Sequence, residues 1–141
     1  MTDKILIEHD GPVTTIVINR PKSKNALDNE AAHGLAAALK GFEANPEARV
    51  AVLTGAGGAF CAGADLAWMA KAAAFSPAEN VQDADAASAM FAAVDNLPAA
   101  VIGRIHGGAF GGGCGLAAVC DAVVAAQDTV FGFTETKLGL L

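Results

Sequence analysis

The sequence has few cysteines, few prolines and few aromatic side chains, and each shortage excludes a class of protein. Its three cysteines, Cys61, Cys114 and Cys120, form neither a CxxC pair nor a Cys/His pattern at zinc spacing. We therefore expect reduced thiols that pack inside a cytoplasmic protein, and no metal site. Five prolines and 6% aromatic residues stand against 16 glycines in 141 residues, which excludes collagen and low-complexity linkers.

Basic residues are also scarce, because nine Lys and Arg stand against fifteen Asp and Glu, for a net charge of -6. No broad basic surface is expected for nucleic acid or an anionic membrane. No window reaches the roughly 20 apolar residues of a membrane span, and no signal-peptide pattern follows Met1. The chain is 53% hydrophobic and contains no repeat or linker, so residues 1–141 are expected to form one domain.

The first third of the chain predicts a hairpin followed by a βαβ unit. Two β-branched runs, residues 5–9 and 13–19, flank an Asp-Gly-Pro turn, which is typical of two antiparallel strands. Asp28 is placed to cap a helix that ends before an Asn-Pro pair, and a strand at residues 50–54 follows. This order favours a parallel crossover between the second and third strands.

The rest of the chain continues the alternation of helix and strand. Ser76 and Glu79 form a predicted capping box with proline between them. The helix that follows carries one apolar stripe, made of Ala86, Met90, Ala93 and Leu97. A buried-type strand at 99–105, a small-residue helix at 112–120 and a further parallel strand at 122–126 complete an α/β fold.

Two glycine-rich junctions, residues 55–65 and 107–114, each follow a predicted strand. The first is not a dinucleotide-binding fingerprint, because Phe60 replaces the third glycine and the acidic residue expected about 20 positions on is missing. Glycines after strands are also ordinary turn residues. Two such junctions together can present bare N–H groups to a developing oxyanion, which suits an acyl thioester as substrate.

Four short motifs occur in a fixed order along the chain. They read Val-Ile-Asn-Arg-Pro with Lys-Asn-Ala-Leu (17–27), Phe-Cys-Ala-Gly-Ala-Asp-Leu (60–66), Gly-Gly-Gly-Cys with Cys-Asp (111–121), and Phe-Gly followed by Glu135 (131–135). This order resembles the enoyl-CoA hydratase/isomerase (crotonase) family over nearly the whole chain. The resemblance implies a crotonase-type fold of ββα repeats with a parallel sheet.

The same resemblance implies a site and a reaction. The N–H groups of Ala64 and Gly112 would bind the thioester oxygen, and Glu135 would lie beside the acyl Cα and Cβ. The residues implied to contact the CoA thioester are Lys24, Ala26, Leu27, Ala62, Gly63, Asp65, Leu66, Gly115 and Thr134. The implied reaction is the syn addition of water across a 2-enoyl-CoA double bond, with CoA as part of the substrate and no separate cofactor.

One departure from the family pattern lies at Gly115, where most hydratases carry a first catalytic glutamate. Here the sequence is similar to bacterial 3-methylglutaconyl-CoA hydratases of leucine breakdown, in which a substrate carboxylate could replace the missing acid. The Δ3,Δ2-enoyl-CoA isomerases of fatty acid metabolism also keep a single glutamate at the position of Glu135. An isomerase is therefore the alternative enzyme.

A second departure is that the sequence stops at Leu141, where family members continue into a helical region. We expect a truncated piece that self-associates or is only marginally folded, whereas the full-length protein would form a homotrimer or hexamer. A non-catalytic acyl-CoA-binding or assembly fragment is the alternative of another class.

Several site residues also have plain structural explanations. Asp65 can cap a helix as well as contact substrate, and Trp68 with Met69 can line an acyl cavity or only pack. Lys24 can meet the CoA phosphates or remain solvated. Glu135 could be a surface acid, and His106 is expected to be a hydrogen-bonded loop residue outside the site.

Overall fold

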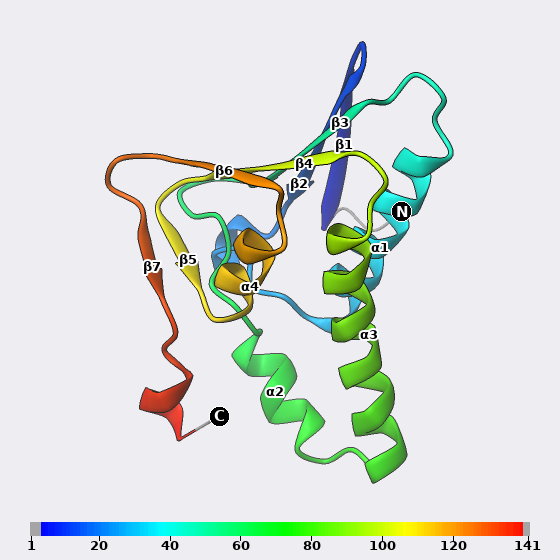
Figure 1. Ribbon diagram of the computed structural model, residues 1–141. Coiled ribbons are helices and arrows are strands. Elements are labelled where there is room, and N and C mark those ends of the chain that lie inside the picture. Colours follow the sequence, from blue (N-terminus) through cyan, green and yellow to red (C-terminus); the bar gives the residue numbers. More distant parts are fainter. Residues whose placement is uncertain (1–3, 140–141) are drawn as a thin grey trace.

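The computed structural model describes residues 4–139, which form a main sheet with helices packed beside it (Figure 1). Neighbouring strands of this five-stranded sheet follow the order β1-β2-β3-β4-β6. The bounds are β1 (Ile5–Asp10), β2 (Val13–Ile18), β3 (Val50–Gly55), β4 (Ala100–Ile105) and β6 (Ala122–Ala125). β1 and β2 pair antiparallel and the other pairs are parallel, which confirms the expected hairpin and parallel α/β sheet.

Two long helices begin at the caps that the sequence predicts. α1 (Asn29–Glu43) is capped by Asp28, whose carboxylate accepts the N–H of Ala31, and it packs on β1 and β2. α3 (Pro77–Asp95) begins with the full capping box of Ser76 and Glu79 and runs alongside α1 (Figure 1). Two short helices, α2 (Leu66–Ala72) and α4 (Gly112–Ala118), follow the glycine-rich junctions.

A second, two-stranded sheet was not expected. β5 (Gly108–Phe110) pairs in parallel with β7 (Val130–Gly132), and a 3-10 turn, η2 (Glu135–Leu138), follows β7. Each strand has only three residues, and glycines reduce the local preference for strand structure. The pairing therefore depends on long-range contacts that sequence periodicity does not reveal.

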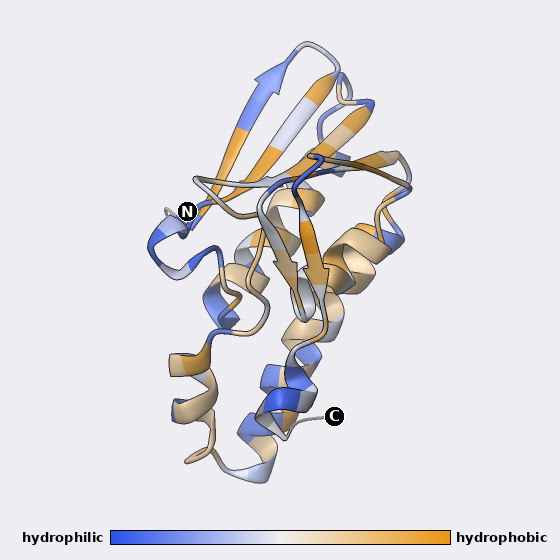
Figure 2. Ribbon diagram, turned by 90° about the vertical axis from the view of Figure 1, so that its left-hand side faces the viewer, coloured by the Kyte–Doolittle hydropathy of each residue, from blue (hydrophilic) through white to orange (hydrophobic). Residues whose placement is uncertain are grey.

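The core lies between the main sheet and helices α1 and α3, with Leu116 and Ala117 of α4 joining it. Figure 2 shows strongly hydrophobic stretches on the strands, although the hairpin ends in a hydrophilic segment. On α3 the buried residues are Met90 and Val94, while Ala86 and Ala93 of the expected stripe are only half-buried. β6, expected as a further parallel strand, pairs in parallel with β4, and its four residues are all exposed. Within residues 4–139, no helix is both long and apolar enough to cross a bilayer.

Exposed apolar side chains gather on β6, on β7 and just after β7. They are Val123, Val124, Val130, Phe131 and Phe133. Exposure is also expected from the sequence at Leu140 and Leu141, which lie outside the described residues.

Candidate active site

A strained turn between β2 and α1 starts one wall of the site. Lys24 and Asn25 both have positive φ, at 52° and 57°. The buried Asn25 amide donates to the carbonyls of Ala56 (2.8 Å) and Ala59 (2.7 Å), and its oxygen accepts the N–H of Arg20 (2.8 Å). Asn25 thus fixes the turn against the first glycine-rich junction, a role that was not expected from the sequence.

An isolated parallel bridge joins Leu27 to Ala64 and orients the Ala64 backbone. The N–H of Leu27 donates to Gly63 O (2.7 Å), and the N–H of Asp65 donates to Leu27 O (2.9 Å). The N–H of Ala64, which lies between these two bonds, makes no hydrogen bond within the described residues. It is therefore free to donate to a ligand.

The second glycine-rich junction lies directly against the first. The N–H of Phe110 donates to Cys61 O (2.9 Å), and an ideal Cβ at Gly63 would lie 2.7 Å from Phe110 O and 3.3 Å from Gly112 N. Only glycine allows this approach, because any side chain would separate the two backbones. The Gly112 N–H also has no hydrogen-bond partner in the described part of the chain, so Ala64 and Gly112 offer two free amides on adjacent segments.

Arg20 forms ion pairs with the N-cap residues of both α1 and α2. Its guanidinium Nη2 lies 2.8 Å from Oδ2 of Asp65 and 3.1 Å from Oδ2 of Asp28, and its Nη1 donates to Ala26 O. Asp65 caps α2 by accepting the N–H of Trp68 (3.0 Å). This cap bond, followed by Arg20, lowers the pKa of Asp65 below its ordinary value. Burial alone would raise that pKa, but it does not outweigh them. The ionised network fixes the segment that carries Ala64.

Two hollows meet at Ala64. The first is a cavity of about 180 Å³ lined mainly by apolar side chains, namely Leu27, Ala32, Ala64, Trp68, Met69, Ala87, Met90, Phe91 and Gly112, with Asp28, Asn29 and Asp83. The second, of about 290 Å³, is lined by Ser23, Ala26, Ala62, Ala64, Asp65, Leu66 and Ala67. Five predicted site residues therefore lie together around the second hollow, and Trp68 with Met69 line the first cavity.

Glu135 begins η2 and lies against the second junction. An ideal Cβ at Gly111 would lie 2.0 Å from its Oε1, so the carboxylate packs on the bare Cα of the residue before Gly112. Its Oε2 is buried and has no hydrogen-bond partner among the described residues. A buried carboxylate oxygen without a partner is costly, and a functional role is one of its explanations. Glu135 is half-buried, with one carboxylate oxygen shielded from solvent, and its catalytic role stays a prediction.

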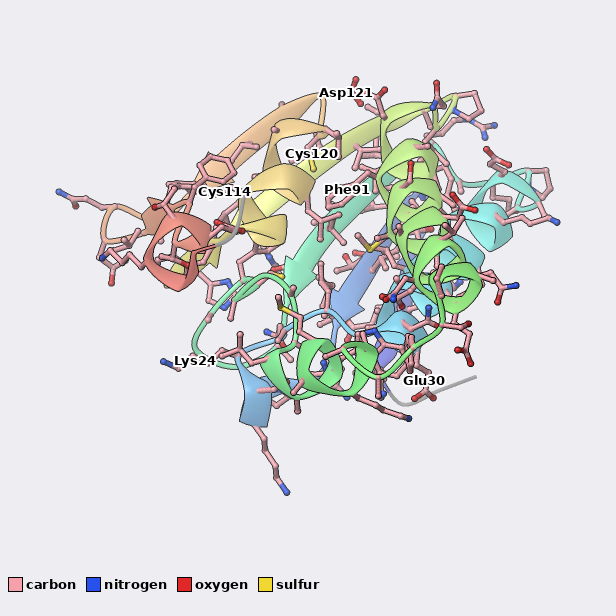
Figure 3. All side chains as sticks on the ribbon, turned by 90° about the horizontal axis from the view of Figure 1, so that it is seen from below. Lys24, Glu30, Phe91, Cys114, Cys120 and Asp121 are labelled. Atoms are coloured by element: carbon pink, nitrogen blue, oxygen red, sulfur yellow. The ribbon has the colours of Figure 1, made fainter. Side chains whose placement is uncertain are left out.

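Leu27 and Gly112 also line the first cavity, whereas the remaining predicted residues line neither hollow, namely Lys24, Gly63, Gly115, Thr134 and Glu135. Gly115 faces the ring of Phe91, which lines the first cavity from its place between α3 and α4 (Figure 3). Lys24 is exposed (Figure 3), and Thr134 occupies the N-cap position of η2, before Glu135, without a side-chain capping bond. His106 Nε2 lies 2.9 Å from Gly57 O, which is a loop contact as expected.

The cysteines pack in the way the sequence predicts. No disulfide joins them, and Cys61 and Cys114 are buried. Burial raises the pKa of the Cys61 and Cys120 thiols to about 11. Thiols with such pKa values are protonated and unreactive at neutral pH.

Comparison with known proteins gives this geometry a context. The sequence profile of the enoyl-CoA hydratase/isomerase family matches residues 8–141. The chain is 37% identical over 143 residues to the probable enoyl-CoA hydratase echA8 of Mycobacterium tuberculosis, covering 99% of this chain and 52% of that protein. It is 36% identical over 144 residues to the carnitinyl-CoA dehydratase of Salmonella enteritidis, covering 100% and 52%.

Solved structures agree with this relationship. The crystal structure of an enoyl-CoA hydratase from Shewanella pealeana superposes with a TM-score of 0.93 at 31% identity, over 98% of this chain and 52% of that one. The chain spans about half the length of the curated relatives it matches. The fold, the two apposed glycine junctions and these matches together show that the chain belongs to the enoyl-CoA hydratase/isomerase family.

Proposed function

We propose that the chain forms the catalytic core of an enzyme that hydrates a 2-enoyl-CoA thioester. The observation that carries this proposal is the buried, unpartnered Oε2 of Glu135 beside the segment that presents the Gly112 amide. A carboxylate oxygen held without a partner against Gly111, the residue before the free Gly112 amide, suits proton transfer beside a polarised carbonyl.

In the proposed reaction, the N–H groups of Ala64 and Gly112 bind the thioester oxygen and stabilise the enolate that forms. Glu135 accepts a proton from water as the water oxygen attacks Cβ, and the same carboxylic acid then returns a proton to Cα. The Cα=Cβ bond gains one H and one OH on the same face, and Glu135 ends ionised as it began. Each oxyanion donor is expected to contribute roughly 3 kcal/mol to the transition state.

The acyl group is proposed to be short and branched. A cavity of about 180 Å³ is smaller than the roughly 300–1,000 Å³ typical of drug-sized ligands. Its lining is mostly apolar and contains no Lys, Arg or His among the described residues. These features favour a neutral branched acyl group over the dicarboxylic 3-methylglutaconyl group, whose free carboxylate would find no basic side chain there.

The test replaces Glu135 with glutamine, which keeps the shape of the side chain and removes its proton-accepting charge. With 3-methylcrotonyl-CoA in ¹⁸O-labelled water, we expect label at Cβ and a rate that falls at least about a hundredfold in Glu135→Gln. Glu47→Gln is the matched control, because Glu47 is an exposed glutamate outside both hollows. An unchanged rate in Glu135→Gln would refute the proposal.

The two alternatives give different results in the same experiment. A Δ3,Δ2-isomerase would move the double bond of a 3-enoyl-CoA without taking up ¹⁸O. A non-catalytic binding fragment would bind saturated acyl-CoA and convert neither substrate. The expected homotrimer or hexamer and the cytoplasmic location stay predictions, and light scattering after size-exclusion chromatography tests the first.

A further inference from the structure

The carboxylate of Asp83 lies in the wall of the first cavity, which the proposed function assigns to the acyl group. Asp83 of α3 lines it, and its Oδ1 accepts hydrogen bonds from Nδ2 of Asn29 (2.9 Å) and from Nε1 of Trp68 (3.0 Å). The indole N–H also lies 3.1 Å from Oδ2. Both donors are neutral, so they fix the position of the carboxylate without cancelling its charge.

The neighbouring charges do not neutralise Asp83 either. It takes part in no ion pair within residues 4–139, whereas Asp28, the other acidic lining residue, is paired with Lys4 and Arg20. Lys71 lies over the Trp68 ring, 5.2 Å from its centroid, and does not line the cavity.

The hollow on the other side of Asp83 adds further acid. Glu79 lines it along with Asp83 itself, and His33 is its only lining residue among the described ones that could carry positive charge. The His33 ring is directed to the carbonyl of Asn29, with Nδ1 at 2.8 Å from that oxygen. The described residues that line this hollow therefore include two carboxylates, Glu79 and Asp83, and no lysine or arginine.

We propose that Asp83 selects the acyl group by charge. The cavity favours an acyl group whose far end carries a positive charge, accepts a neutral end of the same size, and rejects a carboxylate. This inference rests on the proposed function, because it assigns the cavity beside Ala64 and Gly112 to the acyl group. The apolar walls strengthen the effect, since the field of a charge is screened less beside low-dielectric surfaces than in open water.

The experiment measures binding rather than turnover, so it can separate this inference from hydration. Calorimetry on the whole chain would use three saturated thioesters that share the CoA portion: 4-(trimethylammonio)butyryl-CoA, its neutral isostere 5,5-dimethylhexanoyl-CoA, and 3-methylglutaryl-CoA. The saturated acyl groups cannot be hydrated. The wild-type chain should bind the carboxylate ligand at least about tenfold more weakly than the neutral one, and the cationic ligand more tightly than the neutral one.

Asp83→Asn is the informative variant, because an amide oxygen at Oδ1 can accept the same bonds from Asn29 and Trp68. It should reduce both differences to within about threefold while affinity for the neutral 5,5-dimethylhexanoyl-CoA stays nearly constant. Asp85→Asn is the control, since Asp85 is an exposed aspartate of α3 outside the cavity. It should keep the wild-type order.

Each outcome tests either the selection of the acyl group by Asp83 or the proposed hydration. Unchanged selectivity in Asp83→Asn, or equal affinities in the wild type, would overturn selection by Asp83. Charge-selective binding in a chain that hydrates no enoyl-CoA would instead refute hydration alone. If none of the three thioesters binds, the assignment of the cavity to the acyl group is wrong, and the selection by charge fails with it.

Discussion

The ring of Phe91 occupies the space into which a side chain at Gly115 would project. An ideal Cβ at Gly115 would lie 3.0 Å from Cε1 and 3.3 Å from Cζ of that ring. The absence of a carboxylate at position 115 is therefore matched by an aromatic side chain from another helix. The two positions are coupled, and neither can be changed freely alone.

This coupling predicts that Gly115→Glu raises the rate of hydration only when it is combined with Phe91→Ala. The single variant should lose about 1–3 kcal/mol of stability through overpacking and gain no activity. The double variant has room for the second carboxylate and should hydrate a straight-chain enoyl-CoA faster than Phe91→Ala does. Chemical denaturation and rates with crotonyl-CoA measure the two effects.

Phe91→Ala alone is the necessary control, because it enlarges the cavity without adding an acid. If Gly115→Glu is as stable as the wild type, the ring does not fill that space. If the double variant is no faster than Phe91→Ala, the missing carboxylate is not what limits straight-chain substrates.

Gly111→Ala is predicted to inactivate the site by displacing Glu135. The added Cβ would lie 2.0 Å from Oε1, and the glycine has a φ of +50°. Gly11→Ala separates the two causes, since Gly11 has a φ of +54° with no atom near its Cβ position. Gly11→Ala should lose about 1–2 kcal/mol from backbone strain. Gly111→Ala should lose more, because Gly111 combines its positive φ with a ψ of -115°, a conformation that residues with a Cβ avoid, and it alone should lower turnover by about a hundredfold. Equal turnover in both would show that Glu135 does not act from this position.

Local signals were enough to predict the main sheet and its long helices. The β-branched runs before and after Gly11, the cap at Asp28 and the capping box at Ser76 each act within a few residues, and each is present in the structure. The second sheet was missed because β5 and β7 are short and acquire their structure only by pairing with each other.

The candidate site likewise has one part that the sequence predicts and another part that it does not. The resemblance carried by the four motifs predicts that Ala64, Gly112 and Glu135 belong to one site. In the structure Gly63 lies against Gly112 and Glu135 lies against Gly111, and the roles of the three predicted residues stay predictions. Phe91 and Asp83 were missed because they come from α3, where periodicity identifies a buried stripe but not which residues border a cavity. Their roles depend on how α3 meets α2 and α4, which is a property of tertiary packing.

Gly112 and Gly113 are adjacent, yet only the substitution at Gly113 should reduce the stability of the fold. A Cβ at Gly112 would make only ordinary contact, 3.5 Å from Cδ1 of Leu27, whereas one at Gly113 would lie 2.4 Å from Cys61 O. Gly112→Val should therefore keep the far-ultraviolet circular dichroism and lose thioester binding, because its bulk enters the cavity. Gly113→Ala should lose about 1–3 kcal/mol of stability. Unfolding of Gly112→Val would mean that this glycine serves packing rather than ligand approach.

Arg20→Met should destabilise the chain at neutral pH and much less in acid. Burial raises the pKa of Asp28, but its bonds with Lys4 and Ala31 and the charge of Arg20 outweigh it, so the pKa is lowered. The pKa of Asp65 is also lowered, first by the Trp68 N–H and then by Arg20. A depressed carboxyl pKa stabilises the fold above the ordinary value of 3.8, and this contribution is lost as pH falls through the folded pKa.

Removing the guanidinium therefore takes away stability that exists only while the two aspartates are ionised. Urea unfolding at pH 7 should show a loss of about 3 kcal/mol in Arg20→Met, as for other mostly buried ion pairs from which one partner is deleted. At pH 3 the difference in unfolding free energy between Arg20→Met and the wild type should shrink, because Asp28 and Asp65 are then largely protonated in the unfolded chain. Arg49→Met is the control, since Arg49 is exposed and, within residues 4–139, its Nη1 bonds only to the carbonyls of Pro46 and Ala48. A loss that is equal at both pH values would assign Arg20 to packing alone.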